Sequence, residues 1–119
     1  MSTRTVYPTR MVEDAIEAIL VYYSATEDPI SEADLVDRSR DAYTIKVRSV
    51  VMWFLKTEGH LSYPAIGRRF DRDHTSVLAL VRKVHDVVGV DDLQDVVAYT
   101  RDRVAKRMQE RQNALLEAM

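Results

Sequence analysis

The chain has 119 residues, of which 46% are apolar and 30% charged, with three glycines, three prolines and no cysteine. This composition is typical of one globular domain, and it excludes disulfides, thiolate metal sites and a loop-rich β protein. No apolar run approaches the roughly 20 residues of a membrane-spanning helix, and residues 1–10 lack the hydrophobic stretch of a signal peptide. Taken alone, the formal net charge of −2 argues against a nucleic-acid partner.

The charge is, however, distributed unevenly along the chain. Residues 38–83 carry ten basic residues (Lys or Arg) and four acidic ones (Asp or Glu), a net charge of +6. Residues 1–37 carry two basic and eight acidic residues, a net charge of −6, and residues 84–119 carry five basic and seven acidic residues, a net charge of −2. A phosphate backbone responds to local charge, so the basic middle is a candidate nucleic-acid surface. A solvated charged face without a partner is the alternative.

The N-terminal segment predicts an amphipathic helix over residues 12–23. Its apolar side chains recur at helical spacing: Val12, Ile16, Ile19, Leu20 and Tyr23. We expect Thr9 to be its N-cap, with Glu13 and Asp14 near the positive end of the helix dipole. Residues 27–29 break the pattern, residues 31–34 resemble a capping box that opens a short helical turn through Val36, and residues 37–41 form a polar connection.

A second long helix is predicted from Ala42 to Glu58, with Gly59 as its stop. Its buried stripe comprises Val47, Val50, Val51, Phe54 and Leu55. Trp53 and Met52 lie partly off this stripe, and Trp53 is interpreted as core, with a packing surface as the alternative.

Residues 62–88 predict a helix-turn-helix. Ser62 can cap a short helix with Pro64 in its first turn, which turns Ala65, Ile66 and Phe70 inward and Arg68 and Arg69 outward. A tight turn at Asp71-Arg72 leads to a second helix that begins near Asp73, with valines 77, 81, 84 and 88 on its apolar face. Two helices joined by about three residues, the second amphipathic, are typical of this motif.

A last helix is predicted over residues 91–116. Its apolar side carries Leu93, Val97, Val104 and Met108, and Asp91 and Asp92 most simply cap its start. Residues 101–111 are too polar to be buried, and we expect them to project or to pair with another chain.

The turn and second helix of this motif carry a specific signature, Arg72-Asp73-His74-Thr75-Ser76-Val77-Leu78, followed by Val81-Arg82-Lys83-Val84. Over residues 11–88 the chain resembles the C-terminal DNA-binding domain of the bacterial chromosomal replication initiator DnaA. The resemblance implies an all-α fold with a Trp-repressor-like helix-turn-helix at 62–88. We therefore expect a single domain, 1–119, with an additional C-terminal helical extension at 91–118.

The resemblance also implies a set of DNA contacts. The expected major-groove base contacts are Tyr63, Pro64, Asp73, His74 and Thr75. An Asp can accept from a cytosine amino group, a His can bond a base or phosphate, and a Thr methyl can pack on thymine. Capping alone is the alternative for Asp73, and a solvated surface residue is the alternative for His74.

Further contacts are expected with the minor groove and the phosphates. Arg40 matches a minor-groove arginine of the family, with a solvated loop residue as its alternative. Arg48 and Lys56 match phosphate contacts, and Ser76 is interpreted as one. Arg68 and Arg69 match no clear family position; they are further phosphate candidates, or they only keep the helix soluble.

The chain departs from the family pattern in three places. Tyr63 replaces a leucine, which brings a larger ring with a polar tip. Phe70 is followed directly by Asp71-Arg72, one residue fewer than in many initiators. No phosphate-binding loop occurs, because glycines 59, 67 and 89 cannot make one. The chain is therefore predicted to be a stand-alone reader, with an excised domain as the alternative.

We therefore predict a sequence-specific double-stranded DNA-binding protein that reads a DnaA-box-like site in replication or transcription control. It is expected to be cytoplasmic, at the bacterial nucleoid or encoded by a phage or mobile element, and not an enzyme. No cofactor, metal, nucleotide or membrane partner is expected, and a homodimer through the C-terminal helix is left open. The alternative is an adaptor that binds a protein through its acidic N-terminal or its C-terminal helix. RNA binding ranks low, because no platform of exposed aromatics is evident.

Overall fold

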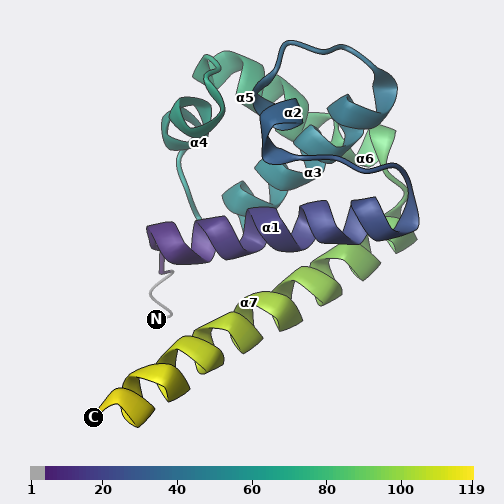
Figure 1. Ribbon diagram of the computed structural model, residues 1–119. Helices are drawn as coiled ribbons and strands as arrows, with labels where there is room; N and C mark the ends of the chain where they lie inside the picture. Colours follow the sequence, from purple (N-terminus) through teal and green to yellow (C-terminus); the bar gives the residue numbers. More distant parts are fainter. Residues whose placement is uncertain (1–4) are drawn as a thin grey trace.

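The structure, a computed structural model, describes residues 5–119, which fold into helices and connecting segments with no β-strand (Figure 1). The all-α prediction is therefore confirmed for this part of the chain. In chain order the helices are α1 (Thr9–Thr26), α2 (Glu32–Val36), α3 (Ala42–Thr57), α4 (Tyr63–Phe70), α5 (His74–Arg82), α6 (Val84–Val87) and α7 (Val90–Ala118).

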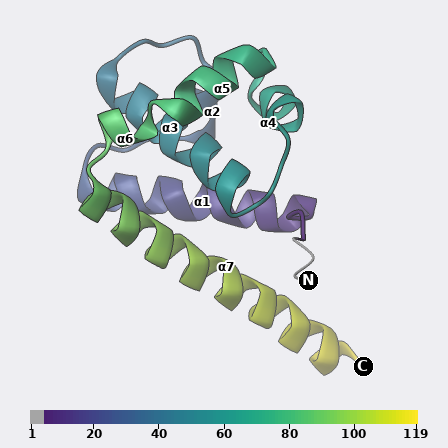
Figure 2. The ribbon, with the colours of Figure 1, turned by 180° about the vertical axis from the view of Figure 1, so that it is seen from behind.

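The α3 helix forms the centre of the core, with α1 on one side and α2, α4, α5 and α6 around it (Figure 2). Its start is capped by Asp41, whose Oδ1 accepts from the Thr44 backbone N–H at 2.9 Å. All members of the predicted stripe are fully buried: Val47, Val50, Val51, Phe54 and Leu55. Met52 is fully buried as well. The chain reverses at His60, whose φ is 57°, rather than at Gly59.

The α1 helix begins earlier than predicted, and its predicted cap is wrong. Pro8 precedes the helix, Thr9 is its first residue, and no side chain caps it. With this start, Asp14 lies beyond the first turn and is buried, with 8% of its surface exposed. Its carboxylate pairs with Arg111 of α7 rather than with the helix dipole. The capping box of α2, by contrast, is present as predicted between Ser31 and Asp34.

The helix-turn-helix is confirmed in α4, the turn at 71–73, and α5. Ser62 caps α4 by accepting from the Ala65 N–H at 3.2 Å, and Pro64 lies in the first turn. Asp71 takes the left-handed conformation, with φ 54° and ψ 50°, which aspartate tolerates better than most residues. The short turn without glycine is therefore accommodated.

The predicted second helix of this motif is split at Lys83 into α5 and the four-residue α6. The Lys83 N–H bonds the Leu80 carbonyl at 3.2 Å, which is the tighter i→i+3 pattern. Valines 81, 84, 87 and 88 surround the break, and such β-branched residues have low helix propensity. Val84 and Val88 remain buried as predicted.

The α7 helix lies along α1 on the side away from the core, so that α1 is sandwiched between α7 and the other helices (Figure 1, Figure 2). Arg107 Nη2 lies 2.7 Å from Glu17 Oε1, and Arg101 pairs with Glu58. The polar stretch 101–111 was expected to project or to pair with another chain. It instead packs on its own chain through these arginines and the buried Val104.

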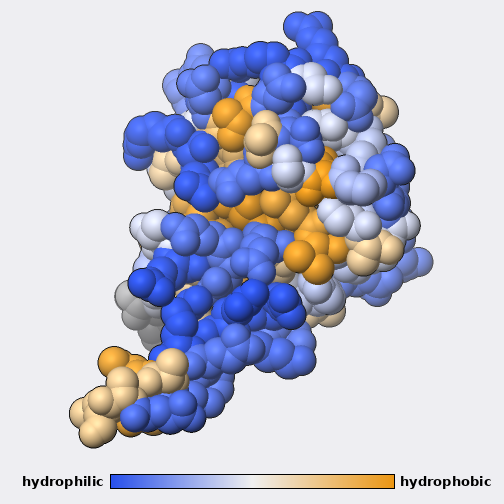
Figure 3. Space-filling model, in the orientation of Figure 1, coloured by the Kyte–Doolittle hydropathy of each residue, from blue (hydrophilic) through white to orange (hydrophobic). Residues whose placement is uncertain are grey.

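Beyond Arg111 the end of α7 extends past the rest of the fold and exposes apolar side chains (Figure 3). Leu115 is 65% exposed, Leu116 61% and Met119 93%. Among residues 5–119, no helix is both long and apolar enough to span a bilayer.

Candidate nucleic-acid interface

One face of the helix-turn-helix forms an open, mostly polar depression of about 710 Å³. It collects side chains from α4, the turn and the start of α5, together with one from the α2–α3 loop: Arg38, Pro64, Gly67, Arg68, Asp71, Arg72, Asp73, His74 and Ser76. This surface therefore brings Arg68 together with four other predicted base or phosphate contacts: Pro64, Asp73, His74 and Ser76. Thr75 lies exposed between His74 and Ser76 on the same first turn of α5.

The first turn of α5 is exposed because the helix buries its other face. Val77 is fully buried and Val81 is 9% exposed, whereas residues 73–76 are all exposed. Asp73 occupies the N-cap position of α5, and hydrogen bonding from the hydroxyl and backbone N–H of Thr75 lowers the pKa of its carboxyl. Its Oδ1 lies 2.9 Å from His74 Nδ1. An N–H on Nδ1 can donate a hydrogen bond to Asp73, and in this tautomer Nε2 can accept one.

Tyr63, Pro64 and Lys56 lie where α3 meets α4. Pro64 is exposed, whereas Tyr63 is half-buried against the core. Lys56 Nζ lies 4.4 Å from the centre of the Tyr63 ring, a cation–π contact. The tyrosine that replaces the family's leucine thus holds the ammonium group of a predicted phosphate contact.

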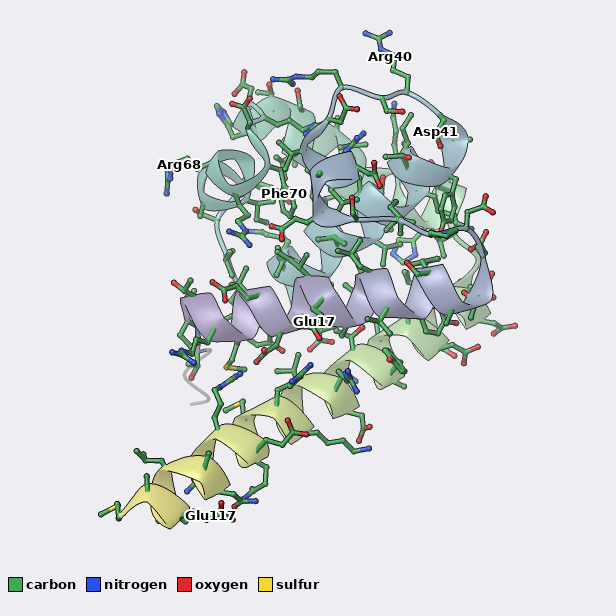
Figure 4. All side chains as sticks on the ribbon, viewed as in Figure 1. Glu17, Arg40, Asp41, Arg68, Phe70 and Glu117 are labelled. Carbon is green, nitrogen blue, oxygen red and sulfur yellow. The ribbon has the colours of Figure 1, made fainter. Side chains whose placement is uncertain are left out.

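Arg40 lies in the segment between α2 and α3 and is exposed (Figure 4). Figure 4 shows it extending away from the helices into solvent. The following residue, Asp41, fixes the end of this segment by capping α3. Hydrogen bonds from the Thr44 hydroxyl and backbone N–H, and from the Ser39 hydroxyl, lower the pKa of Asp41 to about 2.

Arg68 and Arg69 have different surroundings. Arg68 is exposed on α4, lines the depression and points outward (Figure 4). Arg69 lies beside α2, where its Nη2 is 2.7 Å from Glu32 Oε1. Only Arg68 is thus brought together with the residues of α5.

Arg48 occupies a position that does not support the predicted phosphate contact through its side chain. It is 4% exposed, and its guanidinium donates to the carbonyls of Leu35 at 2.9 Å, Asp37 at 3.0 Å and Asp34 at 3.2 Å. Burial and the nearby charge of Arg72 lower the pKa of Arg48. These bonds satisfy the last carbonyls of α2, which have no partner within the helix.

The sequence pattern gave no structural role to the side chain of Arg72, which reaches the same carbonyls from the turn. Its Nη1 donates to Leu35, Val36 and Phe70, and its Nη2 donates to Asp37. Burial and the charge of Arg38 lower its pKa. No local signal could have identified this role, because the acceptors in α2 and at Asp37 are backbone carbonyls 35 to 37 residues away in the sequence.

Nothing in residues 5–119 groups three or more His, Cys, Asp or Glu side chains in a way that could hold a metal ion. The candidate interface presents hydrogen-bonding and cationic groups. Such groups can bond base edges and neutralise phosphates.

Comparison with known proteins finds relatives among the bacterial chromosomal replication initiators. The chain is 40% identical over 81 residues to the chromosomal replication initiator protein DnaA of Xanthobacter autotrophicus, covering 67% of this chain and 15% of that protein. It is 40% identical over 90 residues to DnaA of Brucella abortus, covering 75% and 17%, and 37% identical over 105 residues to DnaA of Rhodopseudomonas palustris, covering 87% and 21%. No solved structure matches.

The chain thus corresponds to about a fifth or less of the length of these relatives. Residues 13–84 match the family described as the bacterial dnaA protein helix-turn-helix, and this span contains α2 to α5 and most of α1. The chain belongs to the bacterial DnaA helix-turn-helix family.

Proposed function

We propose that this protein binds double-stranded DNA sequence-specifically, with the start of α5 in the major groove and Arg40 in the adjacent minor groove. The observation that carries the proposal is the exposed cluster of residues 73–76 at the N-terminus of a helix whose opposite face is buried in the core. A helix-turn-helix places this end of its second helix against base edges. Membership of the DnaA family supports the same reading.

Base reading is assigned to Asp73, His74 and Thr75, with Pro64 and Tyr63 beside them. An Asp carboxylate accepts from a cytosine amino group, and the methyl group of Thr75 suits a thymine methyl. Tyr63 is half-buried and holds Lys56, so its contribution is confined to the exposed part of the ring.

Phosphate contacts are assigned to Arg68, Lys56 and Ser76. All three have their polar group outside the core, and Arg68 and Ser76 line the same depression as His74. Arg48 and Arg69 are bonded within the chain, and we give them structural roles. The phosphate contacts fix the register of the protein on the duplex and carry little sequence information.

The biological role proposed is occupation of DnaA-box-like sites in replication or transcription control. The relatives are replication initiators, and this chain corresponds to only a small part of them. We propose that it acts at bacterial DNA, either chromosomal or phage-borne, and that it is not an enzyme.

A test compares two histidine variants. We measure dissociation constants by fluorescence anisotropy for a duplex with an initiator box and for a scrambled duplex, with wild type, His74→Ala and His85→Ala. His85 is an exposed histidine on α6 that packs against Trp53, and it serves as the matched control. His74→Ala is expected to lower the preference for the box about 5- to 100-fold, because a lost base contact costs roughly 1–3 kcal/mol. An unchanged preference in His74→Ala contradicts the assignment.

A second candidate function, protein binding, is favoured by a groove of about 680 Å³ beside α1 (Figure 3). It is lined by the apolar Leu20, Val21 and Ile30 and by the acidic Glu13 and Glu17, the latter paired with Arg107. This combination suits an amphipathic segment with basic side chains. Weak and equal binding of the wild-type protein to both duplexes would favour this adaptor function.

We also propose that two copies associate through the end of α7, because Leu115, Leu116 and Met119 are exposed there. Light scattering should then give a dimer mass for wild type, and a monomer mass for Leu115→Gln/Leu116→Gln. A monomer mass for wild type at concentrations up to the millimolar range would contradict this.

A further inference from the structure

The C-terminal end of α2 is held by two arginines from different parts of the fold. The carbonyls of residues 34–37 have no partners within α2, as at any helix end. Arg48 reaches them from α3, and Arg72 reaches them from the turn between α4 and α5. The end of α2 is thereby tied both to the core and to the helix-turn-helix.

Both terminal nitrogens of the Arg72 side chain take part in these bonds. Nη2 donates to Asp37 O at 2.6 Å, while Nη1 lies 3.0 Å from Leu35 O, 3.2 Å from Val36 O and 2.8 Å from Phe70 O. Both terminal nitrogens are therefore committed to backbone carbonyls. An arginine in this state offers little to a phosphate, although its place in the middle of the motif suggests such a contact.

The position of Arg72 in the chain gives these bonds a consequence for the DNA-reading residues. It directly precedes Asp73, the N-cap of α5, and its carbonyl acceptor Asp37 begins the segment that carries Arg40. A second tie crosses the same junction in the opposite direction, because Arg38 Nη2 donates to Asp71 O at 3.0 Å. The Arg40 segment and the start of α5 are thus joined by side chains as well as through the core.

We propose that Arg72 is a positioning residue, which fixes the spacing between the Arg40 segment and the start of α5 so that both grooves are read in one register. This inference rests on the proposed function, since it presumes that Arg40 and α5 contact the same duplex. A loop that is already held in place does not lose further conformational freedom on binding. Without the Arg72 bonds, the Arg40 segment is free to move relative to α5, and the minor-groove contact adds less to affinity.

The substitution Arg72→Lys separates this role from a phosphate contact. Lysine keeps the positive charge and can still contact a phosphate. Its single ammonium cannot, however, bridge the carbonyl of Phe70 and the carbonyls at the end of α2 as a planar guanidinium does. A phosphate contact would therefore survive the substitution, whereas the positioning role would not. Arg68→Lys, at an exposed arginine of the same depression, is the matched control.

The first experiment is a double-mutant cycle on the box duplex with Arg40→Ala and Arg72→Lys. In wild type, Arg40→Ala should weaken binding to the box about tenfold. In the Arg72→Lys background, Arg40→Ala should weaken binding to the box less than about twofold, because Arg40 is no longer held over the minor groove. In the Arg68→Lys background it should still cost about tenfold. Equal losses from Arg40→Ala in all three backgrounds would overturn the proposal. Melting curves confirm that each variant is folded.

The second experiment changes the DNA and uses only wild-type protein, so it does not depend on the folding of a variant. The minor-groove base pairs that Arg40 is proposed to contact are displaced by one base pair, about 3.4 Å along the axis, from the base pairs read by α5. If the spacing between the Arg40 segment and the start of α5 is rigid, this displacement should remove the Arg40 contact and lower the affinity for the duplex about tenfold. Equal affinity for the displaced and the original box would overturn the proposal.

The two proposals fail differently. If wild type does not prefer the box over a scrambled duplex, the proposed function fails. If wild type prefers the box but tolerates the displaced element, or if Arg40→Ala costs as much in Arg72→Lys as in wild type, only the positioning role fails.

Discussion

Substitution of Gly67 by alanine tests how closely α4 packs against the turn that leads into α5. A Cβ at this position would lie 2.3 Å from the Arg72 carbonyl oxygen and 3.5 Å from the His74 backbone nitrogen. Contacts of a Cβ below 3.0 Å essentially do not occur, so the turn must shift by at least about 0.7 Å. Overpacking of this kind costs about 1–3 kcal/mol, while alanine recovers about 1 kcal/mol of helix propensity.

Because the contact lies far below 3.0 Å and involves backbone, the upper half of the overpacking cost, about 2–3 kcal/mol, applies. The expected net loss in the free energy of unfolding is therefore about 1–2 kcal/mol. For a chain of 119 residues this corresponds to a fall in Tm of about 4–8 °C. Thermal unfolding followed by circular dichroism measures the change, with Gly89→Ser as the control. Gly89 is the N-cap of α7, where a Cβ would meet nothing within 4 Å and serine is a favoured residue. A Tm for Gly67→Ala equal to or above that of wild type would refute the packing argument.

Three further substitutions test the local structure around the interface. Arg48→Met should lower the free energy of unfolding by about 1–3 kcal/mol in urea titrations, because the Asp34 carbonyl loses its donor and the carbonyls of Leu35 and Asp37 keep only Arg72. A loss below about 0.5 kcal/mol would place Arg48 outside the core network. Ser62→Ala should cost about 1 kcal/mol through the lost cap of α4, and an unchanged urea midpoint would contradict that cap. Asp41, with its pKa lowered to about 2, stabilises the fold above about pH 4, and this contribution is lost as the pH falls toward 2. The Tm difference between wild type and Asp41→Asn should therefore shrink over that interval, whereas a constant difference would argue against the charged cap.

Helix periodicity was sufficient to predict the main elements. The apolar spacing along 47–55 identified the central helix, because five of its residues had to face one core and all of them are buried. Ser62, Pro64 and Asp71 marked the helix-turn-helix, since each residue suits the backbone conformation that it adopts. Local preference and tertiary packing agree at these positions.

The errors arose where tertiary contacts decide the outcome. Thr9 is a good N-cap by residue type, but Pro8 takes that position and the helix starts at Thr9. Asp14 was assigned to the helix dipole, yet its partner is Arg111, which is 97 residues away in the sequence. The pairing of Asp14 with Arg111 leaves no mark in the local pattern.

Arginines illustrate the same limit for the candidate site. In the sequence, Arg48, Arg68, Arg69 and Arg72 are four cations in one basic segment. In the structure only Arg68 is exposed beside the recognition residues, while Arg69 pairs with Glu32 and the other two donate to backbone carbonyls. Every residue carries a carbonyl, so these partners could not be identified from residue types. The net positive charge of this segment therefore overstates the number of arginines that are available to contact DNA.

The central claim is that the start of α5 reads a DNA sequence, and the preference of the wild-type protein between two duplexes tests it most directly. We propose a competition titration at about 0.15 M salt, with an initiator-box duplex and a scrambled duplex of the same length and base composition. If α5 reads the sequence, the box should be bound at least about 10³-fold more tightly than the scrambled duplex. Equal affinity for the two duplexes would contradict it.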